Sequence, residues 1–235
     1  MNSVVIVAAG KGTRMGEGVD KLFLTACGEP VIVHSWRRFD RSSFVDEIVL
    51  VIREERREEF LSLGEEVKTT KPFRLVAGGA ERQDSVWNGL EATSDHSSLV
   101  AIHDGARPCV SEEIIKNCFE AASRIGASVA AQRVTDTLKE ASEENLIERN
   151  IDRSRLWAVQ TPQVFRRAIL KKAMGEVRDR ELQVTDDTAA CEAIGQSVVL
   201  VESVAPNPKV TVPSDLPFVE WLLSRPNETP SCARL

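Results

Sequence analysis

Short apolar runs alternate with helix-like segments along most of this chain, and this alternation is what most constrains its fold. The β-branched run at 3–9 is typical of a central parallel strand that is buried on both faces. Strand–helix alternation at this spacing predicts a mostly parallel sheet with helices on both faces. The expected strands are 3–9, 46–52, 73–79, 99–105, 127–132 and 197–202, and the expected helices are 30–39, 53–63, 82–93, 111–125, 166–174, 186–194 and 215–223.

A glycine-rich turn, AAGKGTRMG, follows the first strand and indicates a phosphate site. Gly10 and Gly12 would let backbone N–H groups approach an anion closely. The spacing fits neither familiar phosphate loop, because Met15 stands where a dinucleotide loop needs its third glycine and no P-loop lysine follows. Arg14 and Lys21 lie close enough in sequence to reach one anion, although a plain turn with two solvated cations remains the alternative.

Composition excludes several classes of function. A net charge of −6 and a pI of about 5.3 argue against a surface that coats nucleic acid. No apolar run approaches the roughly 20 residues of a membrane-spanning helix. The five cysteines form no C-x-x-C pair, which makes a zinc site improbable. Their odd number and the absence of a targeting signal lead us to expect a reducing, cytoplasmic location.

Two more turns are expected beside the glycine loop, because ligands of such sheets bind beyond the carboxyl ends of the strands. The turn HDGARP places Asp104 at a strand end, where a carboxylate can bind a metal ion or ligand, with Arg107 to offset it or hold a phosphate. His103 is interpreted as a semi-buried histidine rather than a catalytic base. The turn AGGAERQDS could read a base edge through its backbone, and Arg82 with Asp84 could be a plain surface pair.

The alternation breaks at 134–150, where two half-polar segments flank a polar turn and predict a β-hairpin that leaves the main body. A lone hairpin is marginal in water, so we expect it to pack on a second subunit. The segments 157–163 and 207–213 are interpreted as polar turns containing proline, and their Thr161 and Lys209 carry no chemical meaning alone. No linker divides the chain, which predicts one domain over 1–235 with an arm at about 134–152.

Seven motifs in order resemble the 2-C-methyl-D-erythritol 4-phosphate cytidylyltransferases, over about residues 3 to 221: AAGKGTRMG with a later lysine, GGAERQDSVWNGL, HDGARP, TDTLKE, DRSRLWAVQTPQ, TDD and KVTVPSDL. Each motif is modest alone, but seven in the right order are highly specific. The resemblance implies a Rossmann-like nucleotidyltransferase fold with a protruding β-hairpin arm that hooks a second subunit. It also implies CTP and methylerythritol phosphate as substrates and Mg²⁺ as the cofactor.

The resemblance implies roles for individual residues. It assigns CTP binding to Ala8, Ala9, Gly10, Gly12, Gly79, Ala80, Ser85 and Gly105. It assigns catalysis to Arg14 and Lys21 on the triphosphate and to Lys209 on the attacking phosphate or the α-phosphate. It assigns the acceptor pocket to Asp104, Arg107, Thr137, Arg153 and Thr161, some of which could serve the partner subunit's site, and it makes Asp104 the protein ligand of Mg²⁺.

Two departures and three alternatives accompany this resemblance. The family often has Asp where Ala80 stands, and Pro208 removes one backbone donor beside Lys209. A ribitol-5-phosphate cytidylyltransferase shares the loop and the chemistry, and a non-catalytic nucleotide-binding protein would share the fold. An NAD-dependent dehydrogenase is disfavoured by Met15 and by Arg53, which stands where an acid is expected after the second strand.

Overall fold

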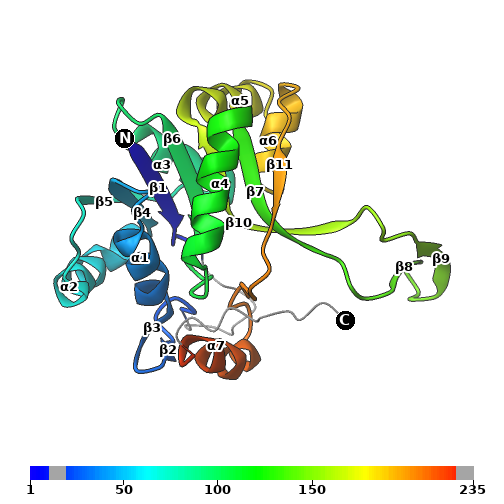
Figure 1. Cartoon of the computed structure of the whole chain (residues 1–235), viewed down its shortest axis with the longest axis horizontal. Helices are drawn as coiled ribbons and strands as arrows, with labels where there is room; N and C mark the ends of the chain where they lie inside the picture. Colours follow the sequence, from blue (N-terminus) through cyan, green and yellow to red (C-terminus); the bar gives the residue numbers. More distant parts are fainter. Residues whose placement is uncertain (11–19, 226–235) are drawn as a thin grey trace.

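A seven-stranded sheet forms the centre of the computed structural model, which describes residues 1–10 and 20–225 (Figure 1). Its strand order is β11-β7-β10-β6-β1-β4-β5. The strands are β1 (Asn2–Val7), β4 (Glu47–Ile52), β5 (Phe73–Ala77), β6 (Leu99–Asp104), β7 (Ala127–Arg133), β10 (Trp157–Arg166) and β11 (Val199–Glu202). All neighbours are parallel except at β10, which runs antiparallel to β6 and β7. The predicted mostly parallel sheet is therefore confirmed.

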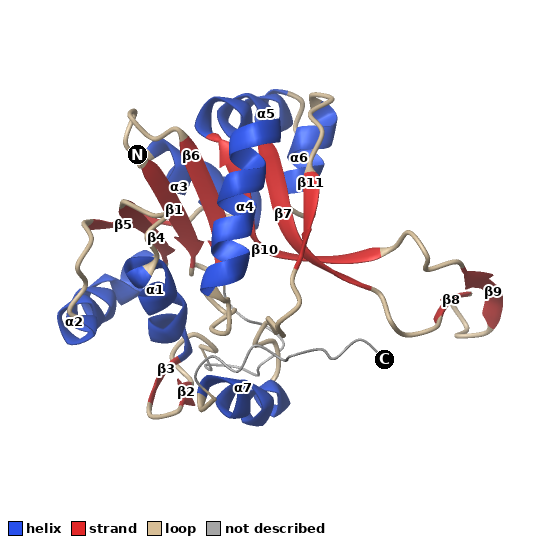
Figure 2. Cartoon of the chain, viewed as in Figure 1, coloured by secondary structure: helices blue, strands red, loops and turns tan. Residues whose placement is uncertain are grey.

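Helices cover both faces of the sheet, as predicted (Figure 2). They are α1 (Val31–Arg41), α2 (Arg57–Val67), α3 (Arg82–Glu91), α4 (Glu112–Ile125), α5 (Arg167–Asp179), α6 (Asp187–Ala193) and α7 (Leu216–Leu223). Successive strand residues point to opposite faces. One core therefore contains Val4 of β1 with Trp36 of α1 and Phe119 of α4, while the other contains Val5 with Leu90 of α3.

The expectation of a turn at 157–163 is wrong, because this segment lies within β10 between β6 and β7. Its pairing with β7 shifts register between Val159 and Gln163, and Pro162 lies in this irregular stretch. Proline cannot donate a ladder hydrogen bond, so it is tolerated where the pairing is interrupted. Two short strands that were not expected, β2 (Thr25–Ala26) and β3 (Glu29–Pro30), form a separate small ribbon before α1.

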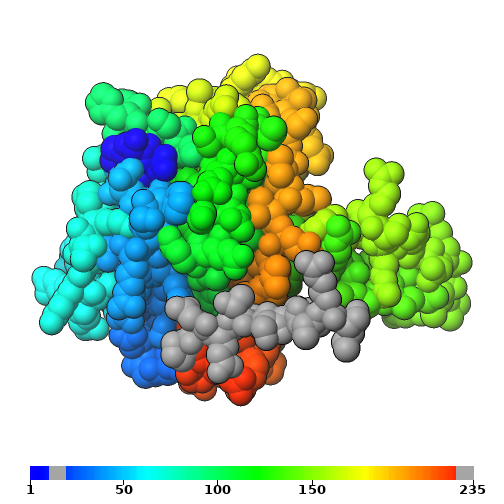
Figure 3. All heavy atoms as spheres, in the orientation of Figure 1, coloured from blue at the N-terminus to red at the C-terminus, as the bar shows by residue number. Residues whose placement is uncertain are grey.

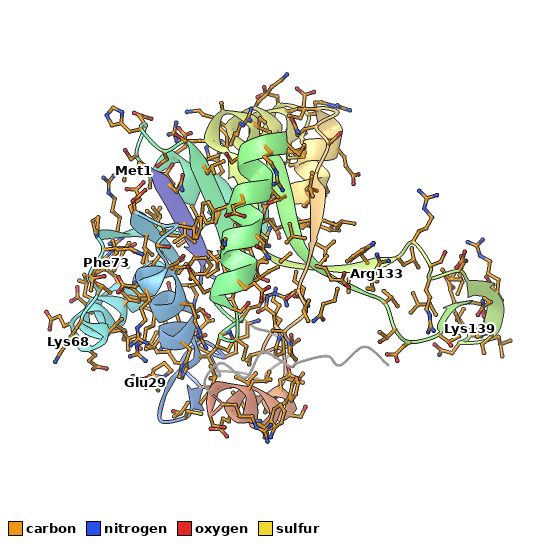
Figure 4. The ribbon with its side chains drawn as sticks, viewed as in Figure 1. Met1, Glu29, Lys68, Phe73, Arg133 and Lys139 are labelled. Carbon is orange, nitrogen blue, oxygen red and sulfur yellow. The ribbon has the colours of Figure 1, made fainter. Side chains whose placement is uncertain are left out.

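A second two-stranded sheet, of β8 (Leu138–Ala141) and β9 (Ile147–Ile151), projects from the body (Figures 1 and 3). Figure 4 labels Arg133, where β7 leaves the body, and Lys139 within this ribbon. Leu146 and Ile147 are 67% and 68% exposed there. The described part of the chain holds no helix long and apolar enough to cross a bilayer.

Candidate functional site

The turns after β1, β5 and β6 meet at one edge of the sheet. Three backbone hydrogen bonds connect the strands at this edge: Ala8 N–H to Val51 C=O at 2.7 Å, Gly105 N–H to Val7 C=O at 3.0 Å, and Gly78 N–H to Ile52 C=O at 2.8 Å. A Cβ added at Gly78 would lie 2.3 Å from the Cβ of Ala9. Only glycine permits this approach, so the turn after β5 lies in contact with the turn after β1.

The turn before α3 presents backbone rather than charge. Ser85 is buried, accepts a hydrogen bond from Gly79 N–H at 3.0 Å and donates one to Glu81 C=O at 3.2 Å. Gly79 and Ala80 are exposed, which leaves their backbone accessible. The carboxylate of Asp84 accepts a hydrogen bond from Glu81 N–H at 3.1 Å and so caps α3. Asp84 therefore does not form the surface ion pair with Arg82 that the sequence left open.

Three cations surround Asp104, which is 8% exposed at the end of β6. Lys209 Nζ lies 2.8 Å from its Oδ2, Arg107 Nε lies 3.4 Å from the same oxygen, and Arg82 Nε lies 3.8 Å from its Oδ1. Burial alone would raise the pKa of this carboxyl, but the charges of Lys209 and Arg82 more than offset burial and hold it well below its usual range. Asp104 is therefore ionised at neutral pH and gathers the cations that an acidic chain must concentrate locally.

Arg82 is oriented by a buried network that sequence reasoning missed. Its guanidinium donates to both oxygens of Asp187 at 3.1 and 2.8 Å, and the Asp187 side chain is 1% exposed. Asp187 N–H donates to Gln163 Oε1 at 3.1 Å, while Gln163 Nε2 donates to Asp186 at 3.0 Å. Asp186 caps α6. The TDD motif was the available signal, but its position beside Arg82 depends on how α6 packs.

Thr161 connects β10 to the end of β6. Its hydroxyl accepts a hydrogen bond from Asp104 N–H at 3.1 Å and lies 3.0 Å from His103 Nδ1. His103 Nε2 lies 3.2 Å from Arg107 C=O, which can only accept, so Nε2 carries the proton and Nδ1 accepts from Thr161. Asn207 Nδ2 donates to Thr161 C=O at 2.8 Å. His103 therefore holds the backbone of this edge and exposes no nitrogen for base catalysis.

The free energy of unfolding should fall as the pH is lowered, because His103 is buried in its neutral form. Burial lowers the pKa of this fully buried imidazole to about 4, whereas an unfolded histidine titrates near 6.5. The unfolded state then binds more protons between these values, so the free energy of unfolding should fall as the pH drops from 6.5 towards 4, by up to about 1.4 kcal/mol per pH unit. Denaturant titrations across this range should show a flatter dependence for His103→Gln.

The matched control for that titration is His96→Gln, because His96 is exposed. It should keep the pH dependence of the wild-type protein. Equal slopes for wild-type protein and His103→Gln would show that His103 does not carry the effect.

A cavity of about 240 Å³ lies beside the Asp104 cluster. Its lining is mostly polar and comes from five parts of the chain: Arg82, Asp104, Arg107, Val159, Gln160, Thr161, Gln163, Thr185, Asp186 and Lys209. The structure thus unites Asp104, Arg107, Thr161 and Lys209 of the predicted site, and adds Arg82, Gln160 and Gln163, which the sequence did not single out.

Other predicted site residues lie apart from this cavity. Thr137 and Arg153 are exposed in the segments that lead to β8 and from β9, and neither lines it. The Arg153 guanidinium donates to Thr135 C=O. Gly12 and Arg14 fall outside the described residues. Lys21 is described and lies in a turn before β2.

The donor set fits one mode of Mg²⁺ binding. Among residues 1–10 and 20–225, no three His, Cys, Asp or Glu side chains gather as a metal cage. Two carboxylates line the cavity: Asp186 is engaged as the cap of α6, where it accepts a hydrogen bond from Ala189 N–H, and Asp104 has its Oδ2 facing Lys209 and Arg107. Mg²⁺ commonly keeps its waters and binds through one or two carboxylates plus substrate phosphates. Asp104 therefore fits as a single protein ligand to an ion carried mainly by phosphate oxygens.

A mostly parallel sheet with clustered cations beyond its carboxyl ends is the arrangement of an α/β nucleotidyltransferase, the class to which fold and site assign this chain. Within that class, the chain belongs to the family described as "IspD: 2-C-methyl-D-erythritol 4-phosphate cytidylyltransferase", whose family model matches residues 2–225.

Relatives and solved structures agree with this assignment. The 2-C-methyl-D-erythritol 4-phosphate cytidylyltransferase of Bacillus velezensis is 44% identical over 221 residues, which cover 94% of each chain. That of Caldanaerobacter subterraneus is 41% identical over 224 residues, 95% of this chain and 99% of the relative. The crystal structure of the same-named protein from Thermus thermophilus is 33% identical, with a TM-score of 0.79 over 96% of this chain and 100% of that one.

Proposed function

We propose that this chain transfers a cytidylyl group from CTP to 2-C-methyl-D-erythritol 4-phosphate, releasing pyrophosphate and serving isoprenoid biosynthesis. The observation that carries this proposal is the Asp104 cation cluster, built at the sheet edge of a chain that belongs to this family throughout residues 2–225. The ribitol-5-phosphate alternative shares this chemistry, but no relative described above carries that name.

The chemistry requires positioned charge rather than a strong base. A phosphate monoester is largely ionised at neutral pH, since its second pKa is about 6, so its oxygen can attack the α-phosphorus of CTP directly. This agrees with a site where His103 is buried and hydrogen-bonded on both nitrogens. Catalysis then depends on bringing two polyanions together and stabilising the charge that develops on the transferred group.

The residues divide this work by position. Lys209 and Arg107, which line the cavity, hold the attacking phosphate, and Arg82 adds charge beside Asp104. Arg14 and Lys21 act on the α-phosphate and the leaving pyrophosphate. Gly79, Ala80 and Ser85 read the cytosine largely through backbone groups, while Ala8, Ala9, Gly10, Gly12 and Gly105 cradle the nucleotide. Bound Mg²⁺ would neutralise triphosphate charge, with Asp104 as its protein ligand.

Two subunits complete the proposed assembly. The ribbon of β8 and β9 is marginal by itself and exposes Leu146 and Ile147, which a second copy of the chain would cover. Thr137 and Arg153 lie near its base, outside the cavity of their own chain. We therefore assign them to the acceptor site of the partner subunit, and place the homodimer in the cytoplasm.

A substrate panel tests the function. Purified protein with CTP and Mg²⁺ should release pyrophosphate with methylerythritol phosphate and far less with ribitol 5-phosphate. The reverse preference would establish the ribitol alternative. No release with either acceptor, while CTP still binds, would favour a non-catalytic nucleotide-binding protein. An Asp104→Asn sample prepared in parallel controls for contaminating activity.

Replacing Arg153 by alanine should raise KM for methylerythritol phosphate at least tenfold and leave CTP affinity nearly unchanged, because one phosphate contact is lost. Steady-state kinetics with each substrate varied in turn measures both effects. The matched control is Arg155→Ala, an exposed arginine two residues further along. An equal loss of affinity for CTP and for methylerythritol phosphate would contradict the assignment of Arg153 to the acceptor site.

Mixing subunits tests whether the site is shared. Arg153→Ala and Lys21→Ala chains, each impaired alone, should regain part of the wild-type activity when allowed to exchange subunits, because one of the two sites would then be intact. Absence of recovery from a verified mixed dimer would place Arg153 in the site of its own chain.

A further inference from the structure

The turn that carries Lys21 is fixed on its carboxyl side. Phe23 N–H donates to Asp20 C=O at 3.0 Å, which closes a tight turn around Lys21. Leu22 is 3% exposed, and its carbonyl accepts a hydrogen bond from Ile32 N–H at 3.1 Å in α1. The backbone next to Lys21 is therefore tied to the first turn of a buried helix.

On the amino side, the carboxylate of Asp20 joins this turn to the end of β4. The Asp20 side chain is 7% exposed. Oδ1 accepts a hydrogen bond from Leu22 N–H at 3.0 Å, while Oδ2 accepts from Arg53 and from Arg56 Nη1, the latter at 3.2 Å. Arg53 directly follows β4, and Arg56 directly precedes α2. One buried carboxylate thus connects Lys21 to two other elements of the sheet edge.

The arginine side of this contact is itself held in place. The Arg56 guanidinium lies 3.8 Å from the centroid of the Phe23 ring, and its Nε donates to Glu59 at 2.9 Å. Phe23 packs edge-on against Phe60 of α2, with ring centroids 5.4 Å apart. Arg56 therefore contacts the Lys21 turn twice, through the carboxylate of Asp20 and through the ring of Phe23.

We propose that Asp20, together with Arg53, is a positioning residue that fixes Lys21 for the transferred phosphate. This inference rests on the proposed function, because it needs Lys21 to act on CTP. A lysine side chain is long and flexible, so the position of its ammonium group depends on where its backbone is held. A misplacement of about 1 Å in such a group can lower the rate about 100-fold.

Ordinary surface ion pairing is the competing explanation, and the burial of Asp20 argues against it. Exposed pairs such as Arg57 with Glu54, one turn away, contribute little, since water and salt screen them. The Asp20 carboxylate is shielded and shared by a backbone N–H and two guanidinium groups. Its removal would take away the one carboxylate that Arg53 and Arg56 share, and would leave them only their more exposed partners Glu55 and Glu59.

The test compares Asp20→Ala, Asp20→Asn and Arg53→Gln with the control Arg57→Gln. Asp20→Ala should lower kcat about tenfold to 100-fold and change KM for methylerythritol phosphate by less than threefold. Asp20→Asn keeps an acceptor for Leu22 N–H, so it should lower kcat less than Asp20→Ala does. Arg57→Gln should match wild type. Wild-type kcat in Asp20→Asn and Arg53→Gln would overturn the proposal, even if Asp20→Ala fails to fold.

A second background separates positioning from structural damage. In Lys21→Ala protein, Asp20→Ala should have little further effect on kcat, because its action passes through Lys21. An equal fold-loss in both backgrounds would overturn the proposal and leave the function intact. If Lys21→Ala itself retains wild-type kcat, Lys21 has no catalytic role, and the positioning role of Asp20 is overturned with it. The panel of acceptors described above reports on the function independently.

Discussion

Replacing Lys21 by alanine is expected to lower kcat by about 100-fold to 1,000-fold, while KM for CTP changes by less than about threefold. A fixed cation directed at the α-phosphate and the leaving pyrophosphate contributes more as charge develops in the transition state than it does in the ground state. Losing such an interaction lowers kcat and kcat/KM together. Initial rates with CTP varied at saturating methylerythritol phosphate measure the two parameters.

The control for this prediction is Lys116→Ala, because Lys116 is an exposed lysine of α4 that pairs only loosely with Glu120 at 4.0 Å. It should retain wild-type kinetics. A Lys21→Ala protein with unchanged kcat and a raised KM for CTP would reduce Lys21 to a binding residue and contradict the mechanism.

The sequence predicts the parts of this fold that local patterns determine. The apolar run at 3–9 indicates β1, and the run ending at Asp104 indicates β6. Strands that are buried on both faces have nearly continuous apolar sequences, which makes them recognisable. The rule that ligands gather beyond the carboxyl ends of parallel strands then places the turns at Asp104 and at Gly78 at the same edge of the sheet as the glycine loop after β1. The hydrogen bonds at this edge agree with both inferences.

Long-range packing determines what the sequence left out. The segment 157–163 has the proline and polar residues of a turn, yet residues 157–159 pair with β7 and Gln163 pairs with both β6 and β7, which makes the segment part of a strand. Tertiary pairing overrides local propensity in this way. Arg82 was interpreted with its sequence neighbour Asp84, whereas its partner Asp187 lies 105 residues away. No local spacing encodes that contact.

The site also shows why an acidic chain can bind two polyanions. Arg82, Arg107 and Lys209 come from three separate segments, and the charge of Asp104 allows them to lie close together. Arg82 is further balanced by Asp187. The carboxylates thus offset part of the repulsion among the cations and hold them in fixed positions, as the binding of two polyanions requires.

Replacing Asp104 by asparagine should therefore damage both stability and activity. The substitution removes the charge that compensates three cations at a position 8% exposed, and breaking a buried pair in this way typically costs about 3–5 kcal/mol of the free energy of unfolding. We expect kcat/KM for methylerythritol phosphate to fall at least 100-fold. Denaturant titration and steady-state kinetics at pH 7 measure the two losses separately.

The double variant Asp104→Asn with Lys209→Met distinguishes the two roles of this carboxylate. Removing Lys209, which lies 2.8 Å from Asp104, relieves the largest uncompensated charge, so the double variant should regain part of the lost stability. Its activity should stay at the level of Asp104→Asn or below, because both the proposed Mg²⁺ ligand and the proposed phosphate contact are absent. A double variant that recovers near wild-type turnover would show that Asp104 serves only as a structural partner of Lys209.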